Sequence, residues 1–206
     1  MTSGRAAENS PARRPAILLV PGWKDRSPVM EPLAQHLRAS GWPDERVTTV
    51  AFDDPFGSNR EHADELQHAL QRLERESGAD RIVIVAHSMG GLATRWYLAR
   101  DPSPKVKAAL FLATPHRGTW LAWLGWGSGA GEMRPRSAFM QDLSAAAVPP
   151  DVKLICFRAP GDTRLFPAST AWLDGAECRT LPALGHKRIL RQQRVFDEVT
   201  RTLVTL

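Results

Sequence analysis

The chain has 206 residues, of which 43% are hydrophobic and 24% are charged. This composition excludes a disordered chain and is typical of a globular protein, and the length suits one domain. The net charge of +5 comes from Lys and Arg spread along the sequence rather than gathered in a block. We therefore interpret it as solvated surface and expect no nucleic-acid partner.

The N-terminal residues 1–14 are polar and include Gly, Ser and Pro. They predict a mobile tail in front of a single domain over residues 15–206. No apolar run reaches the ~18 residues that a membrane span needs, so no transmembrane segment is expected. The short run at 16–20 leads into a Pro-Gly turn and not into a cleavage site, which predicts a cytoplasmic protein without a signal peptide. A secreted protein whose leader had been removed would have the same sequence.

Strand and helix patterns alternate along the rest of the chain. Ala16–Val20 is a continuous apolar run between two prolines, and Arg81–Ala86 (RIVIVA) is apolar on both faces, as a central parallel strand should be. The other expected strands are Val47–Phe52, Val106–Ala113, Val152–Arg158 and Glu177–Leu181. Helices are expected around Met30–Leu37, from about Glu61 to Glu76, over Gly90–Arg100, and around Val195–Leu203. This alternation predicts an α/β fold, a compact and mostly parallel sheet of about six strands with helices on both faces.

Ala86-His87-Ser88-Met89-Gly90-Gly91 joins the RIVIVA strand directly to the next helix. This is the nucleophile-elbow pattern of α/β hydrolases, with Ala in place of the first glycine. Small residues are needed there because the strained turn presses the positions two before and two after the serine against neighbouring backbone. The pattern predicts Ser88 as a nucleophile and the backbone N–H of Met89 as an oxyanion donor. The alternative is a structural turn.

The first strand ends in Val20-Pro21-Gly22-Trp23. In an α/β-hydrolase fold, the loop after this early strand supplies a second oxyanion donor. We therefore expect the backbone N–H of Trp23 in that role. The alternative is an ordinary Pro-Gly turn with Trp23 packed in the core.

The base and the acid should follow the serine in the order acid, then histidine. Three of the six histidines, His36, His62 and His68, precede Ser88 on expected surface helices, and His87 lies inside the elbow. His186 follows the last strand and is preferred over His116, which comes too early to leave room for an acid. Asp162, on the loop after Val152–Arg158, is the predicted acid, and its rival Asp174 is interpreted as a turn residue.

Taken together, these segments resemble the bacterial lipase/esterase family of the α/β-hydrolase superfamily, including the small Bacillus-type lipases. The chain is most similar to members with a Thr-Pro-His-x-Gly-Thr segment. The segments that carry the resemblance are VPGW, VAHSMGGLATRWYL, LATPHRGT, MRPRSAFMQDL, GDTRLFPASTAWLDGA and LGHKRIL. The resemblance implies Ser88, Asp162 and His186 as a catalytic triad and Trp23 and Met89 as oxyanion donors.

The sequence departs from the family pattern at two places. The usual His-Gly at the end of the first strand is Pro21-Gly22, and the Asn-Val pair often found after the acid is replaced in Thr163-Arg164-Leu165. These departures concern the oxyanion loop and the contacts of the acid loop.

Residues 117–150 interrupt the alternation and are rich in Trp and Gly. Trp120 and Trp123 are one helical turn apart and predict a short amphipathic helix. One hypothesis makes their rings a substrate-binding wall or small flap for apolar acyl groups near the active site. The other makes them packing beneath a long loop.

We expect a serine carboxyl-ester hydrolase, an esterase or lipase acting on small-molecule or lipid esters. A thioesterase, amidase or acyltransferase with the same triad is the alternative, and a non-catalytic binding module is disfavoured by the intact Ser, Asp and His set. No metal-ligand spacing or phosphate-binding loop is present, so no metal or cofactor is expected. Cys156 and Cys178 are interpreted as buried free thiols, with a disulfide between them as the lesser alternative.

Overall fold

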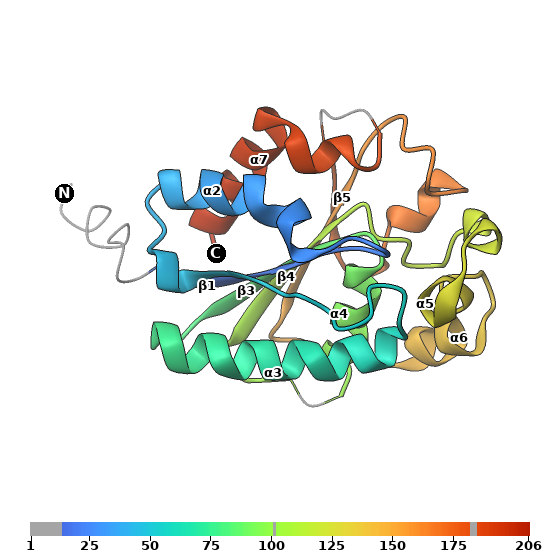
Figure 1. Cartoon of the computed structure of the whole chain (residues 1–206), viewed down its shortest axis with the longest axis horizontal. Coiled ribbons are helices and arrows are strands. Elements are labelled where there is room, and N and C mark those ends of the chain that lie inside the picture. The colour runs from blue at the N-terminus through green and yellow to red at the C-terminus, as the bar shows by residue number, and fades with distance from the viewer. Residues whose placement is uncertain (1–13, 101, 182–184) are drawn as a thin grey trace.

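The computed structural model describes residues 14–100, 102–181 and 185–206. The predicted mobile tail therefore lies, apart from Arg14, outside the described residues. Six parallel strands form one sheet in the order β2-β1-β3-β4-β5-β6 (Figure 1). The strands are β1 Ala16–Val20, β2 Val47–Thr49, β3 Ile82–His87, β4 Val106–Leu112, β5 Lys153–Arg158 and β6 Glu177–Thr180. The sheet and its six strands confirm the predicted fold class, although β2 ends three residues earlier than expected.

Helices cover both faces of the sheet. Helices α2 (Glu31–Ala39) and α7 (Gln193–Val204) lie on one face, and α3 (Asn59–Ser77) and α4 (Gly90–Leu98) lie on the other (Figure 1). Residues of β1 alternate between the two apolar layers, with Leu19 packed in the first and Leu18 in the second. Since both layers are apolar, the strands read as continuous hydrophobic runs in the sequence.

The long helix α3 starts two residues before the predicted position because its first turn is capped. The backbone N–H of Arg60 donates to Ser58 Oγ, and the N–H of Ser58 donates to Glu61 Oε2. This reciprocal pair satisfies two N–H groups that the helix leaves without partners. Gly78 ends the helix in the left-handed conformation, with φ of 58°.

The insertion after β4 folds into three short helices that share a third apolar cluster with Met89 and Leu92. They are the 3-10 helix η4 (Trp120–Leu124) and the α-helices α5 (Gly127–Glu132) and α6 (Ala138–Ala145). A side chain at Gly129 would lie 2.5 Å from the carbonyl oxygen of Gly57 and 2.7 Å from Met89 Sδ. Gly129 therefore lets the insertion approach the start of α4 closely.

Glu132 anchors the insertion to the start of α3. Its carboxylate accepts hydrogen bonds from Ser58 Oγ at 2.6 Å and from the backbone N–H of Asn59 at 2.6 Å. A negative charge at a helix N-terminus is stabilised by the N–H groups and by the helix dipole.

The remaining short elements lie in the segments that connect the strands and helices. They are the 3-10 helices η2 (Ser27–Met30), η3 (Asp44–Arg46), η5 (Ala168–Ala171) and η6 (Arg188–Arg191). Each helix in the described ranges is too short or too polar to span a lipid bilayer.

Two expectations about burial were wrong. Cys156 is a buried free thiol, but Cys178 is exposed, because β6 is the edge strand and has only β5 as a neighbour. His62 was expected on a surface helix and is instead 1% exposed. Its ring stacks on Phe52 at 3.9 Å between centroids, and its Nε2–H donates to the carbonyl oxygen of Asp54.

Candidate active site

Ser88 occupies the turn between β3 and α4 with a φ of 52°. A left-handed conformation at a residue other than glycine costs of order 1–3 kcal/mol, so neighbouring structure must hold it. The backbone N–H of Ser88 donates to Leu112 O at 2.9 Å, and the N–H of Gly91 donates to Ser88 O at 3.0 Å. The turn is thereby fixed to the adjacent strand β4 and to the first turn of α4.

The two glycines after the serine are required by the space around them. A Cβ at Gly90 would lie 2.2 Å from the carbonyl oxygen of Pro21, and one at Gly91 would lie 2.0 Å from Thr114 Oγ1. Neither position can hold a larger residue unless the neighbouring segments move. The close contact with Pro21 also brings the loop after β1 against the elbow.

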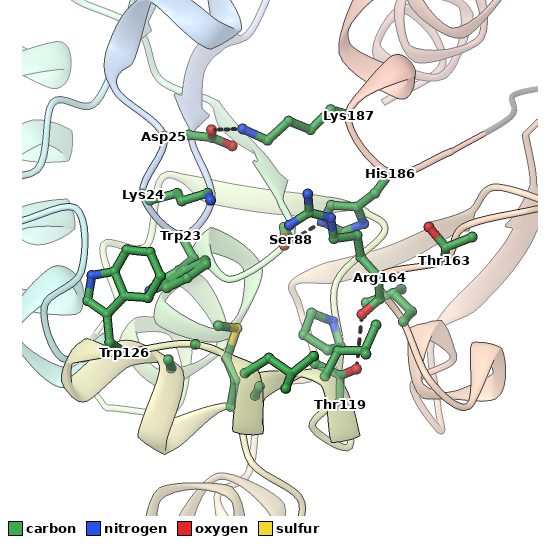
Figure 2. A pocket seen from close by; sticks show the side chains of 18 residues that line it. Trp23, Lys24, Asp25, Ser88, Thr119, Trp126, Thr163, Arg164, His186 and Lys187 are labelled. Carbon is green, nitrogen blue, oxygen red and sulfur yellow. Dashed lines mark hydrogen bonds and ion pairs between the residues drawn. The ribbon is translucent and has the colours of Figure 1, made fainter.

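The structure brings Ser88, His186 and Asp162 together in one hydrogen-bonded line (Figure 2 shows Ser88 and His186). Ser88 Oγ lies 2.8 Å from His186 Nε2, and His186 Nδ1 lies 2.7 Å from Asp162 Oδ2. A carboxylate only accepts, so Nδ1 carries the proton and Nε2 offers its lone pair to the hydroxyl. This arrangement can take a proton from the serine while the carboxylate stabilises the resulting imidazolium.

Asp162 is held by the backbone that follows it. Its other oxygen, Oδ1, accepts from the N–H of Arg164 at 2.8 Å and from the N–H of Leu165 at 3.3 Å. The side chain of Asp162 is 3% exposed. Since backbone groups make these contacts, the unusual side chains of Thr163-Arg164-Leu165 do not disturb the carboxylate.

The rival acid and the rival histidine lie elsewhere. Asp174 is 91% exposed and pairs with Arg117 at 3.0 Å. His116 is buried and accepts a hydrogen bond from the Cys156 thiol at 3.3 Å. Burial and then the nearby Arg95 cation hold the pKa of His116 well below its usual value, and burial raises the pKa of Cys156 to about 12. Both groups are therefore neutral near pH 7.

The predicted oxyanion donors flank the serine. A Cβ at Gly22 would lie 2.9 Å from Ser88 Cβ, so the loop that carries Trp23 packs directly on the nucleophile turn. Met89 follows Ser88 and precedes the first residue of α4. Within the described ranges, neither the N–H of Trp23 nor that of Met89 has a protein acceptor. Both N–H groups are thus free for a ligand oxygen.

His87 is a neighbour of the site that the sequence pattern did not single out. Its Nε2–H donates to the carbonyl oxygen of His186 at 3.1 Å, and the two rings lie 4.8 Å apart. Burial, followed by the charge of His186, holds the pKa of His87 well below its usual value. A neutral His87 therefore supports the backbone of His186 from inside the protein. The only signal in the sequence was its place inside the elbow.

A cavity of about 330 Å³ opens above Ser88 and His186 (Figure 2). Its apolar wall consists mainly of side chains from the insertion and the β1 loop, namely Trp23, Leu121, Leu124, Trp126 and Met133. Polar side chains at the same cavity are Lys24, Asp25, Thr163, Arg164 and Lys187. Apolar walls with a few polar groups are typical of sites for small organic ligands.

The structure places Trp120 and Trp123 neither in the cavity wall nor in packing beneath the loop. Their side chains are 53% and 57% exposed, and neither lines the cavity or packs in the core. In the 3-10 helix η4, residues three apart share a face, so Trp120 and Trp123 point away together while Leu121 and Leu124 face the cavity. The tryptophans in the wall are Trp23 and Trp126, whose ring centroids lie 5.3 Å apart.

Asp25 and Lys187 form an ion pair of 2.5 Å beside the site. Asp25 belongs to the loop after β1, and Lys187 follows His186 directly (Figure 2). In the described part of the chain, no group of three or more His, Cys, Asp or Glu side chains is arranged to hold a metal ion.

Residues 15–136 match the family model of the alpha/beta hydrolase fold. The structure is similar to lipase BlEst2 of Bacillus licheniformis in its mature form, with a TM-score of 0.76 and 16% identity over 92% of each chain. It is also similar to lipase B of Aspergillus fumigatus, with a TM-score of 0.76 and 18% identity over 92% of this chain and 52% of that one. Phospholipase PlaB of Legionella pneumophila gives a TM-score of 0.71 and 13% identity over 92% of this chain and 59% of that one. At these identities the likeness shows a shared fold.

Proposed function

Because the chain belongs to the alpha/beta hydrolase fold family, we propose that it is a serine hydrolase that cleaves carboxyl esters with apolar acyl groups. The observation that carries the proposal is the hydrogen-bonded line from Ser88 through His186 to Asp162 at the floor of an apolar cavity. Two of the similar structures bear the name lipase, which agrees with this choice.

In the first half of the proposed reaction, Ser88 Oγ attacks the ester carbonyl carbon while His186 Nε2 takes the hydroxyl proton. The carbonyl electrons move onto the oxygen, which then faces the free N–H groups of Trp23 and Met89. When the tetrahedral intermediate collapses, the C–O bond to the alcohol breaks and His186 returns its proton to the departing oxygen. The acyl group remains on Ser88 as an ester.

In the second half, water repeats these steps. His186 removes a proton from water, and the resulting hydroxide attacks the acyl carbon. Ser88 Oγ then leaves with the proton from His186, and the free acid is released. Asp162 stays ionised throughout and holds the Nδ1–H tautomer of His186. The nucleophile, the base, the carboxylate and the oxyanion donors come from the chain itself, and water is the second reactant.

The cavity supports an apolar acyl group as the substrate part bound beside Ser88. Its wall offers Leu, Met and Trp side chains, and among the described residues Asp25 is the only carboxylate that lines it. Since Asp25 is paired with Lys187, its charge is already balanced. Each methylene that moves from water onto such a wall contributes about 0.8 kcal/mol.

Hydrolysis of nitrophenyl esters with acyl chains of graded length tests the proposal. We expect turnover by the native protein, and a loss of kcat/KM of roughly 10³-fold or more in Ser88→Ala. Ser144→Ala is the matched control, since Ser144 is exposed on α6 and bonds only within its own helix. Native-like turnover by folded Ser88→Ala protein would refute the proposal.

A further inference from the structure

Most of the exposed large apolar side chains in the described part of the chain lie near the active site. Among the described residues, the exposed large hydrophobic side chains, apart from Val204 on α7, belong to η4, to the residues just after it and to the loop after β5. This apolar rim consists of Trp120, Leu121, Trp123, Leu124, Trp126 and Phe166, whose exposed fractions run from 37% to 80%. A contiguous exposed apolar patch on a folded chain marks a binding surface.

The apolar rim adjoins the mouth of the cavity. Leu121, Leu124 and Trp126 are exposed and also line the cavity, so they belong to both the outer surface and the wall. The backbone N–H of Trp120 donates to the carbonyl oxygen of Phe166 at 3.1 Å, which places Phe166 beside η4. A molecule that covers the rim therefore meets the entrance to Ser88.

The cations at the rim have no counter-ion within the described part of the chain. Lys24 Nζ lies 5.1 Å from the ring of Trp23 and 5.8 Å from that of Trp126, and Arg134 Cζ lies 4.4 Å from the ring of Trp123. Arg164 lines the cavity and is exposed.

The nearby carboxylates are already bonded inside the protein. Asp25 pairs with Lys187, Asp162 with His186, and Glu132 accepts from Ser58 and Asn59. The rim thus presents apolar rings together with unpaired positive charge.

We propose that the apolar rim docks on an anionic lipid surface, with the cavity mouth facing the lipid. Tryptophan rings prefer the boundary between headgroups and acyl chains, and Lys and Arg at the edge attract anionic headgroups. The charge argues against a second copy of the chain as the occupant. Two rims that met around a twofold axis would bring Lys24, Arg134 and Arg164 of each copy close to one another.

This proposal deepens the proposed function, because a docked cavity would receive its ester from the lipid layer. The docking itself needs no catalysis, so the two can fail separately. Trp120 and Trp123 lie outside the cavity, and their replacement should leave the turnover of a soluble ester unchanged.

Flotation with vesicles provides the test. The native protein should bind phosphatidylglycerol vesicles at least about tenfold more strongly than phosphatidylcholine vesicles, and high salt should weaken the binding. The double substitution Trp120→Ser with Trp123→Ser should weaken binding to phosphatidylglycerol vesicles by about tenfold or more. Its hydrolysis of soluble nitrophenyl acetate should stay within about twofold of the native rate.

Val204→Ser is the matched control, because it removes an exposed apolar side chain from α7, outside the rim. It should bind vesicles as the native protein does. Equal binding to both vesicle types, native-like binding by the folded double variant, or no binding by the native protein would overturn the proposal. So would a dimer that the double substitution dissociates, since a second copy would then cover the rim. If the native protein bound vesicles but did not hydrolyse nitrophenyl acetate, the proposed function alone would be contradicted.

Discussion

The ammonium group of Lys187 lies 2.5 Å from Asp25 Oδ1 and joins two segments that are 162 positions apart in the sequence. One segment carries Trp23, the predicted oxyanion donor, and the other carries His186. Asp25 is 7% exposed, whereas Lys187 is about half exposed. The pair therefore fixes the loop after β1 against the histidine across the top of the site.

Removal of the lysine alone should cost more stability than removal of both charges. In Lys187→Met the Asp25 carboxylate stays buried without a counter-ion, and we expect the free energy of unfolding to fall by about 1–2 kcal/mol. Adding Asp25→Asn should recover much of that loss, because the buried charge is gone. Urea unfolding of the two single variants and the double variant measures the coupling. Additive losses would contradict the assigned ion pair.

A second prediction concerns stability at acid pH. The folded pKa of His87 is held well below 6.5 by burial and by His186, so the unfolded chain binds a proton that the folded chain does not. The contribution of His87 to the free energy of unfolding should be fully present above about pH 6.5. Below that pH it should fall by up to about 1.4 kcal/mol per pH unit. His116, whose pKa is lowered in the same way, adds a similar loss.

His87→Gln keeps a side-chain N–H donor but does not titrate. Below pH 6.5 its free energy of unfolding should therefore fall less steeply than that of the native protein. The two slopes should differ by up to about 1.4 kcal/mol per pH unit. His68→Gln, at an exposed position of α3, serves as the control and should keep the native slope. An unchanged slope in folded His87→Gln would show that His87 takes up a proton in the folded protein.

The sequence predicted the sheet and the Ser88, Asp162 and His186 group because both depend on order along the chain. A buried strand, a small-residue turn and a helix define the elbow, and the ends of later parallel strands must meet at the same edge. The cavity wall could not be predicted in this way. Trp120 with Trp123 and Leu121 with Leu124 have the same spacing, and only the packing of η4 on the protein decides which pair faces inward.

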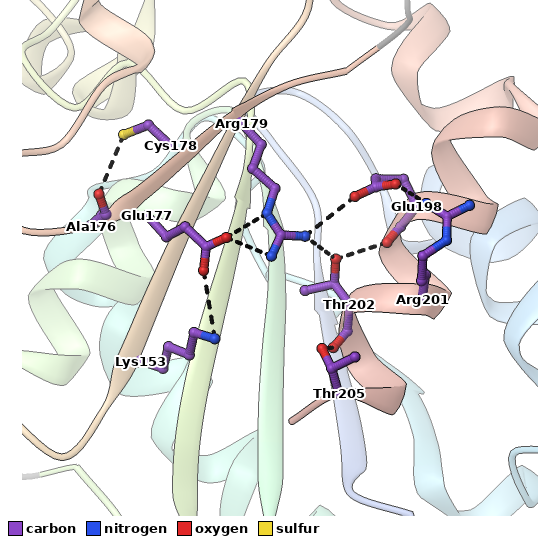
Figure 3. Close-up of polar contacts among 9 residues, drawn as sticks. All are labelled: Lys153, Ala176, Glu177, Cys178, Arg179, Glu198, Arg201, Thr202 and Thr205. Carbon is purple, nitrogen blue, oxygen red and sulfur yellow. Dashed lines mark hydrogen bonds and ion pairs between the residues drawn. The ribbon is translucent and has the colours of Figure 1, made fainter.

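The exposure of the side chains of β6 also could not be predicted from the sequence. Figure 3 shows Arg179 between Glu177 on its own strand and Glu198 and Thr202 on α7. The sequence predicts a buried thiol at Cys178, but β6 is the edge of the sheet, and Arg179 on it pairs with Glu198 on α7. Periodicity in a sequence does not reveal which strand lies at an edge.

The glycines of the elbow and of the insertion should respond in opposite ways to alanine. Gly91→Ala places a Cβ against Thr114 and should destabilise the protein by about 1–3 kcal/mol. A Cβ at Gly131 would meet no atom within 4 Å, so Gly131→Ala should stabilise α5 by about 0.4–1 kcal/mol. Thermal unfolding of both variants decides the matter, and a harmless Gly91→Ala would contradict the close packing of the elbow.

Acyl-chain preference should follow the cavity wall and not the outer tryptophans. Leu124→Ala shortens the wall and should lower kcat/KM for octanoate esters relative to acetate esters, by about fourfold for each methylene that no longer packs on the wall. Trp120→Ala should leave this ratio unchanged, because its ring lies outside the cavity. Nitrophenyl esters from acetate to octanoate give the ratio directly. An equal change in both variants would mean that the wall is assigned to the wrong face of η4.

The central claim is that Ser88 is an activated nucleophile, and covalent labelling tests it most directly. An organophosphonate should react once per chain, and peptide mass spectrometry should place the adduct on Ser88, with labelling abolished in Ser88→Ala and strongly slowed in His186→Ala. An adduct on another residue, or none on native protein that hydrolyses esters, would contradict the account.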